Sequence, residues 1–497
     1  MKFCIRVFRI TEKDNGYITP YQLCAEGSSL SAGKASGASP RWYPFIGCNS
    51  ILHKRTVKYG SQWKAISEMA KEYSTNVLGL KMGNERVVVV YGEKNIQQVS
   101  NDKVFDARPD NFFLRLRSFG RRCGITFVDG PLWREHKLFT FKYLRNIGYG
   151  KELMHEDIKY NLKNILNFIN NSNGNPINIK IMVAMSAMNI LWKYVAGEHI
   201  KDSQLRKIIE LLSARSKIFT MAGGWLNQWP FLRFIAPEWS GYAVIKKMNE
   251  QIHDIIIESI EKHKKKSVKG KDFIYAFLDE MHKNKATYTE DQLTGTCLDF
   301  LIAGAQTIGS SFDFMILAAL RNADIQEKMY QEIISVLGDE DYNWPDIKRL
   351  VYTTAFVCEV QRYYTIAVFS GARRTLADSI LDGYTIPSGT TILVSLGDLH
   401  TDPELWDEPT KFEPERFIDA NGRLKSSTHS YPFGLGRRRC PGEPLAKPFL
   451  LTSLVAILQK YRIESSNGVL PSDEPHIGML AEPRPFTARF VKRKLSQ

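Results

Sequence analysis

The feature that most constrains this chain is a glycine-rich run around one cysteine near its C-terminus. The run consists of Pro432, Phe433, Gly434, Leu435, Gly436, Arg437, Arg438, Arg439, Cys440, Pro441 and Gly442. Glycine permits tight turns and lets the backbone approach a flat ligand closely. Three arginines precede the cysteine and a helix pattern follows it, and both features favour a thiolate. The run therefore predicts a thiolate ligand for a soft metal centre, of the kind that promotes O–O cleavage.

Composition limits the classes of partner. The chain has 497 residues, 43% of them hydrophobic, which is ample for a large core. Its formal charge of +14 favours an acidic partner: nucleic acid, an anionic membrane or an acidic protein. No nucleic-acid-binding motif lies beside the densest basic run, so we expect a solvated loop there and no nucleic-acid partner. That run comprises Lys262, Lys264, Lys265, Lys266, Lys269 and Lys271.

The cysteines indicate the redox compartment of the protein, and the first residues indicate where its folded domain begins. The seven cysteines are odd in number and form no Cys-x-x-Cys pair, so a reducing compartment is favoured over a disulfide framework. Residues 1–38 contain no apolar run of the ~20 residues that span a bilayer. They also lack a secretory signal. We expect a divergent N-terminal segment without a clear anchor helix over 1–38, and one domain over 39–497.

Periodicity and turn residues predict a mainly α chain with a small β region. The β-branched run within 77–91 is typical of a strand, and Gly130 and Pro131 open a helix. A loop is expected over 171–176. Long helix patterns cover 290–320 and 346–365. The residues 383–387 and 390–394 are expected to form short strands around a turn.

The cysteine run resembles the haem-binding signature of the cytochrome P450 family, Phe-x-x-Gly-x-Arg-x-Cys-x-Gly. It matches at Phe433, Gly436, Arg438, Cys440 and Gly442. The resemblance extends from about residue 39 to the C-terminus and implies the mainly helical haem-thiolate fold. It also implies that Cys440 is the axial ligand of haem b (iron protoporphyrin IX), that Arg438 binds a propionate, and that Phe433 packs near the sulfur.

A second match concerns folding. Glu359 and Arg362 are three residues apart on a helix pattern and share a face. Alone they would be an ordinary surface ion pair, but they resemble the family's Glu-x-x-Arg pair. Arg416, within the segment 412–417, resembles the arginine that joins this pair. The resemblance implies that these three residues lock the fold around the cysteine run.

A third match lies within the long apolar helix pattern. Ala303 and Thr307 are four residues apart and face the same way, which leaves room for O₂ and offers it a hydrogen bond. The segment resembles the family's oxygen-activation motif, in which an acid usually precedes the threonine. Here Gln306 stands in that position, and an amide cannot relay a proton by ionising.

Further matches predict the residues that hold the propionates. Trp133 and Lys137 resemble the family's Trp-x-x-x-Arg, with a lysine that keeps the charge and loses the bidentate fork. Arg108 and Arg373 match two more propionate-binding positions. Outside these sites, the helix expected after the cysteine is about three residues shorter than the usual helix of the family. It also contains Pro448, which removes a backbone hydrogen-bond donor from the helix.

Within the family the chain resembles the animal microsomal branch, especially insect members that include methyl farnesoate epoxidases. This implies a monomeric monooxygenase that inserts one oxygen atom from O₂ into an apolar small molecule such as a terpenoid, steroid, fatty acid or xenobiotic. Electrons would come from NADPH through cytochrome P450 reductase, with cytochrome b5 as a second candidate partner. Arg437, Arg439 and Lys447 would dock the acidic reductase. The aromatic segment 224–235 would dip into the endoplasmic-reticulum membrane from its cytosolic face.

Two alternatives stay open. Gln306 keeps a haem-thiolate isomerase or dehydratase that uses a preformed peroxide under consideration. A catalytically idle haem-binding or sensor protein is the other alternative. Dependence of product formation on NADPH and reductase separates both from a monooxygenase. The residues do not identify the substrate.

Overall fold

The computed structural model describes residues 39–43, 46–219, 224–265, 270–283, 285–338, 340, 346, 349–425 and 428–493. The predicted mainly α fold with a small β region is confirmed. Its helices are α3 (Asn49–Tyr59), α4 (Gln62–Glu72), α5 (Glu93–Asn101), α6 (Phe112–Arg117), α7 (Gly130–Asn146), α8 (Glu152–Asn171), α9 (Lys180–Ala196), α10 (Asp202–Ile218), α11 (Gly224–Gln228), α12 (Leu232–Ile235), α13 (Tyr242–Lys265), α14 (Phe273–His282), α15 (Glu290–Arg321), α16 (Ala323–Leu337), α17 (Val351–Tyr364), α18 (Leu396–His400) and α19 (Glu443–Lys460). Short 3₁₀ turns are η1 (Lys103–Phe105), η3 (Pro414–Phe417) and η4 (Gly436–Arg438).

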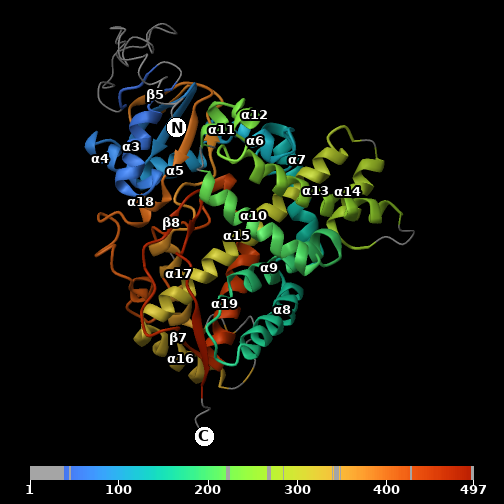
Figure 1. The fold of residues 1–497 in the computed structure, drawn as a ribbon, viewed down its shortest axis with the longest axis vertical. Coiled ribbons are helices and arrows are strands. Elements are labelled where there is room, and N and C mark those ends of the chain that lie inside the picture. Colours follow the sequence, from blue (N-terminus) through green and yellow to red (C-terminus); the bar gives the residue numbers. More distant parts are fainter. Residues whose placement is uncertain are drawn as a thin grey trace.

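The long helix α15 organises the helical part of the molecule. The hydroxyl of Thr289 caps its start by accepting the N–H of Gln292, as expected for a helix opening there. Helices α9, α13, α17 and α19 pack against it (Figure 1). Within the described residues, α15 is the one helix long and apolar enough to cross a membrane, and 78% of its most apolar stretch is buried inside the protein. Its apolar character therefore reflects a core position.

A four-stranded sheet forms the main β region, in the order β1-β2-β6-β3. Strands β1 and β2 are an antiparallel hairpin, and β2 pairs in parallel with β6, Val87 opposite Thr391. This sheet lies beside α3 and α4 at one end of the molecule (Figure 1). The strands are β1 (Val77–Met82), β2 (Glu85–Val90), β3 (Arg373–Arg374), β4 (Ser379–Leu381), β5 (Tyr384–Ile386), β6 (Thr391–Val394), β7 (Tyr461–Ser465), β8 (His476–Ile477), β9 (Ala481–Glu482) and β10 (Ala488–Lys492).

Several expected elements differ in detail from the structure. The strands expected around a turn at 383–394 exist, but β5 pairs with β4 while β6 joins the main sheet. The helix expected over 346–365 begins only at Val351. The lysines at 262, 264 and 265 lie in the last turn of α13 and not in a loop, where their charge complements the helix dipole. Lys266, Lys269 and the N-terminal segment 1–38 lie outside the described residues.

Helix α19 runs from Glu443 to Lys460 with Pro448 inside it. The missing N–H costs one helical hydrogen bond close to the start of the helix. Phe449 and Leu450, which follow directly, are buried in the main core. Burial of this apolar face offsets the missing bond, so the helix that follows the cysteine run is retained.

Candidate functional site

The cysteine run forms a tight loop that includes η4 and ends where α19 begins. The backbone N–H of Cys440 donates to the carbonyl of Phe433 at 2.8 Å and closes the loop. Gly436 has a φ of +67°, and a Cβ there would lie 2.0 Å from the carbonyl oxygen of Ser100 on α5. Glycine is therefore required where this loop meets α5. The side chain of Phe433 is half-buried against the main core.

The electrostatics at the sulfur differ partly from the expectation. Cys440 is exposed to the adjoining concavity. Desolvation by the protein around it still raises the pKa of its thiol, and backbone hydrogen bonds at Gly442 and Glu443, where α19 begins, lower it. The helix start acts as predicted. The arginines do not, because two of them point to other partners: Arg437 donates to the Asp106 carboxylate at 2.6 Å, and Arg438 donates to the carbonyls of Asp106 and Val128.

Four predicted propionate-binding residues gather behind this loop. The Arg438 guanidinium stacks on the Trp133 ring at 3.7 Å, and the Lys137 ammonium lies 4.9 Å from the same ring. Lys137 also donates to the carbonyl of Arg437. Arg373, on β3, donates to the Leu435 carbonyl at 3.4 Å. Trp133, Lys137, Arg373 and Arg438 therefore surround one region, and their binding of the propionates stays a prediction.

Arg108 completes this cluster from the chain segment before α6. It donates to the backbone carbonyls of Gly371 and Ala372, both at 2.6 Å, which orient it without neutralising it. Burial lowers the pKa of Arg108 well below its usual range, and repulsion from Arg438 and Arg373 lowers it further.

The charge of this cation cluster can be compared with that of the haem carboxylates. Burial is also the largest cause that lowers the pKa values of Arg373 and Arg438, each to about 10, although Asp106 opposes the shift. Burial and then Arg438 lower the pKa of Lys137. Buried cations that repel one another are relieved by anions. The two carboxylates of a haem suit this cluster beside a cysteine at a helix start, so the residues present fit the group.

The segment expected to activate oxygen lies on α15, so its predicted helix is confirmed. Ala303 is exposed and Thr307 is half-buried, on a helix whose neighbouring residues are buried. The Thr307 hydroxyl donates to the Ala303 carbonyl at 2.8 Å. Helix α15 packs against α19, the helix that follows Cys440.

The side chain of Gln306 points to a carboxylate that the sequence did not reveal. Gln306 is 4% exposed and donates to Glu482 of β9 at 2.6 Å. The other oxygen of Glu482 accepts from Lys180 at 3.1 Å and from Ser213 at 3.2 Å. Asp313 lies two turns further along α15, and burial raises its pKa to about 7. A buried carboxylate thus lies directly behind the residue that replaces the expected acid.

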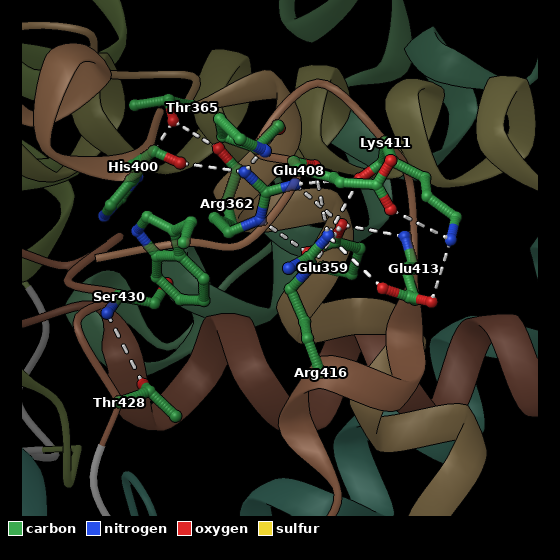
Figure 2. Close-up of polar contacts among 12 residues, drawn as sticks. Glu359, Arg362, Thr365, His400, Glu408, Lys411, Glu413, Arg416, Thr428 and Ser430 are labelled. Atoms are coloured by element: carbon green, nitrogen blue, oxygen red, sulfur yellow. Dashed lines mark hydrogen bonds and ion pairs between the residues drawn. The ribbon is translucent and has the colours of Figure 1, made fainter. Parts of the chain in front are cut away.

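Glu359, Arg362 and Arg416 form the predicted cluster (Figure 2). Glu359 and Arg362 are fully buried, and Arg416 is half-buried. The Arg362 guanidinium donates to both Glu359 oxygens at 2.6 and 2.7 Å, and Arg416 donates to Glu359 at 3.1 Å. Arg362 also donates to the carbonyls of His400, Pro409 and Lys411, which ties α17 to the segment before the cysteine run.

His400 extends this cluster to the cysteine run, and the sequence did not single it out. Its Nε2 accepts the backbone N–H of Tyr431 at 2.9 Å, one residue before the run begins. Its Nδ1 lies 2.8 Å from the Thr365 hydroxyl, which itself donates to the Arg362 carbonyl. The ring therefore carries its hydrogen on Nδ1 and is neutral. Burial lowers the pKa of His400 to about 3, and Arg362 contributes to this shift.

A concavity of about 1110 Å³ opens beside the cysteine run, and Cys440 lines it. More basic than acidic residues line it, and the two acidic ones are Asp106 and Glu443. Arg439 and Lys447 are exposed there, whereas Arg437 is paired with Asp106 and so contributes less free charge than predicted. Lys447 pairs with Glu443 across one exposed turn. The basic lining residues are Lys103, Arg134, Lys137, Lys142, Arg145, Arg437, Arg439 and Lys447.

Comparison with known proteins gives a consistent result. The sequence profile of the family "Cytochrome P450" matches residues 38–490. "Probable cytochrome P450 305a1" of Drosophila melanogaster is 37% identical over 483 residues, 94% of this chain and 96% of the relative. "Farnesoate epoxidase" of Bombyx mori is 38% identical over 426 residues, 84% and 86% of the two chains. "Cytochrome P450 2H2" of Gallus gallus is 29% identical over 442 residues, 86% and 89% of the two chains.

The neutral state of His400 predicts a specific acid sensitivity. The unfolded chain takes up a proton on this histidine below about pH 6.5, whereas the folded protein does so only near pH 3. Stability present above about pH 6.5 is therefore lost as the pH falls toward 3. We expect His400→Gln to lower the thermal midpoint at about pH 7, and to reduce its further loss between about pH 7 and about pH 5.

The matched control is His53→Gln, at an exposed position on α3. It should leave the midpoint and its pH dependence unchanged. An equal loss of midpoint between the two pH values in His400→Gln and in the unaltered protein would contradict this account of His400.

Proposed function

The chain belongs to the cytochrome P450 family, and on this premise we propose that it oxygenates an apolar terpenoid with Cys440 as the sulfur ligand of the haem iron. As a family member it is a haem-thiolate monooxygenase, and haem and iron are its cofactors. The observation that carries the ligand assignment is the cysteine loop at the start of α19 beside a buried cluster of arginines. The terpenoid class is proposed from the printed name of the Bombyx mori relative.

The cation cluster would hold the haem carboxylates. Arg108, Arg373 and Arg438 present guanidinium groups already oriented by backbone carbonyls, and Lys137 adds a charge beside Trp133. Oriented donors lose little freedom on binding, which favours a fixed haem position. When bound, haem supplies activation of O₂ and transfer of one oxygen atom.

Thr307 would orient the oxygen, since its hydroxyl can turn from the Ala303 carbonyl to a ligand above this exposed face of α15. The overall reaction joins O₂, NADPH, a proton and the substrate, and yields hydroxylated or epoxidised product, water and NADP⁺. A proton source close to Thr307 is therefore required. We propose that Glu482, which accepts from Lys180 and from the Gln306 amide next to Thr307 in the chain, would take up a proton from solvent and pass it toward Thr307.

Electrons would come from NADPH through a reductase, which would dock at the basic concavity. Arg439 and Lys447 present exposed charge there, close to Cys440. Opposite charge on a partner accelerates association and sets its orientation.

The membrane is the second proposed contact, at the cytosolic face of the endoplasmic reticulum. Phe231, Phe234, Ile235 and Trp239 are exposed large apolar side chains within or next to α12. Such a patch is typical of a membrane-contacting surface. Cell fractionation tests this assignment: we expect the protein with microsomal membranes, and recovery wholly in the cytosolic fraction would contradict it.

Turnover with isotopically labelled O₂ tests the reaction. With NADPH and reductase, we expect product from an isoprenoid substrate to carry one labelled oxygen atom. An isomerase or dehydratase would instead form product from a peroxide without NADPH, and an idle haem protein would consume no NADPH with any substrate.

Charge reversal tests the docking surface. We expect Arg439→Glu combined with Lys447→Glu to lower reductase-supported turnover by about tenfold or more, because steering and docking are lost. Haem content should be unchanged. The control is Lys264→Glu combined with Lys265→Glu, an equal reversal at two exposed positions at the end of α13. Unchanged turnover in the double variant would remove this surface from the account.

Substitution of Glu482 tests proton delivery. Glu482→Gln keeps a hydrogen-bonding side chain and removes the ionisable group. We expect the share of NADPH electrons recovered in product to fall by about tenfold, with hydrogen peroxide rising in proportion. Glu482→Asp should retain part of the coupling. Normal coupling in Glu482→Gln would contradict the assignment.

A further inference from the structure

Arg215, on α10, is a buried cation without a counter-ion in the described part of the chain. It is 6% exposed, and its Nε atom has no hydrogen-bond partner. Burial lowers its pKa to about 9, and repulsion from Arg117 lowers it further, with no carboxylate acting in the opposite direction. Arg362, also fully buried, instead has Glu359 and three carbonyls as partners.

An arrangement of this kind is unfavourable in the protein alone. A buried charge is retained when it is paired, and a buried donor when it is hydrogen-bonded. Arg117 meets this requirement, because its guanidinium lies 2.8 Å from the Asp299 carboxylate. The other oxygen of Asp299 accepts the backbone N–H groups of Ile125 and Thr126, so this carboxylate already serves Arg117 and the loop before α7. Arg215 therefore needs an anion from outside the pair.

The neighbours of Arg215 locate it near the oxygen-activation motif. Asp299, Ala303 and Thr307 follow one another at four-residue spacing and lie on one face of α15. Arg117 is bound to the first of these, and helix α10, which carries Arg215, packs against α15. About 12 Å of helix separates Asp299 from Thr307. Arg215 thus lies on a helix that packs directly against the helix carrying Thr307.

The surroundings of this region are apolar. One buried cluster contains Phe113 and Leu114 of α6, Phe219, which follows α10, and Leu226 of α11. Phe127 and Met479 pack against it. The turn between β8 and β9 is fixed to α10, because the Met479 and Leu480 N–H groups donate to Ser216, the residue after Arg215. A ligand here would meet an apolar wall and one cationic group.

We propose that Arg215 binds the carboxylate of the substrate, so that the preferred substrate is an apolar acid whose chain extends along α15 toward Thr307. This inference rests on the proposed function and specifies its substrate class. A guanidinium binds a carboxylate through two parallel N–H···O bonds, which sets orientation as well as affinity. Anchoring the acid at Arg215 would present a carbon far from the carboxylate to the oxygen at Thr307.

The test compares a long-chain isoprenoid acid with its methyl ester, by the ligand-induced change in haem absorbance. The unaltered protein should bind the acid more tightly than the ester. Arg215→Gln should weaken binding of the acid by about tenfold or more and leave that of the ester within about twofold. Arg215→Lys should keep part of the preference, since the charge remains and the fork is lost.

The matched control is Arg206→Gln, the same change at an exposed position of α10. Preparations are compared only where the reduced carbon monoxide complex has the absorbance of a thiolate-ligated haem, so that failure of the proposed function is recognised separately. Equal weakening of acid and ester in Arg215→Gln would overturn the inference. If that variant does not fold, tighter binding of the ester than of the acid by the unaltered protein would overturn it equally.

Discussion

The buried carboxylate of Glu359 is the contact on which the position of the cysteine loop depends. It is held between Arg362 and Arg416 and also accepts the backbone N–H of Glu413. Removing one partner of such a cluster leaves an uncompensated buried charge, at a cost of about 3–5 kcal/mol. The same guanidinium of Arg362 holds the His400 carbonyl, and the His400 ring holds Tyr431. A single ionic cluster thus reaches from α17 to the start of the loop that carries Cys440.

The proposed ligand-binding regions carry an excess of positive charge, and the structural cluster around Glu359 contains its own carboxylate. In the Glu359 cluster both cations contact one buried carboxylate. In the cluster of Arg108, Arg373 and Arg438, burial lowers the pKa of each cation and repulsion from neighbouring arginines lowers it further, although Asp106 opposes the shift. Arg215 has no carboxylate acting on it within the described residues. Anions from bound molecules would balance both places: the haem carboxylates at the first and a substrate carboxylate at the second. The basic concavity differs again, because its exposed charges suit a protein partner.

The sequence predicted those parts of the site in which residue types recur at short, fixed spacing. Cys440 with its glycines, the pair of Glu359 and Arg362, and the turn from Ala303 to Thr307 all belong to this class. The mainly α architecture followed from periodicity and from the resemblance. The strand pairings were less predictable, since β2 and β6 are about 300 residues apart and meet only in the folded chain.

Residues that act through contacts between distant segments were not predictable in this way. Glu482 meets Gln306 across 176 residues of chain. His400 and Arg215 each stand in sequence contexts that an ordinary core or surface residue would share. The prediction that Arg437 presents a free charge was also wrong in part, because Asp106, about 330 residues earlier in the chain, pairs with it. Such contacts depend on tertiary packing, which short-range patterns do not encode.

Ligation of the haem iron by the Cys440 thiolate is tested most directly by the absorbance of the reduced protein after carbon monoxide is added. A haem iron bound to the Cys440 thiolate should give the strongly red-shifted band of sulfur ligation, and Cys440→Ser should lose it while Cys358→Ser, at a half-buried cysteine elsewhere, keeps it. A folded, haem-containing protein without that band, or a Cys440→Ser variant that retains it, would contradict the account.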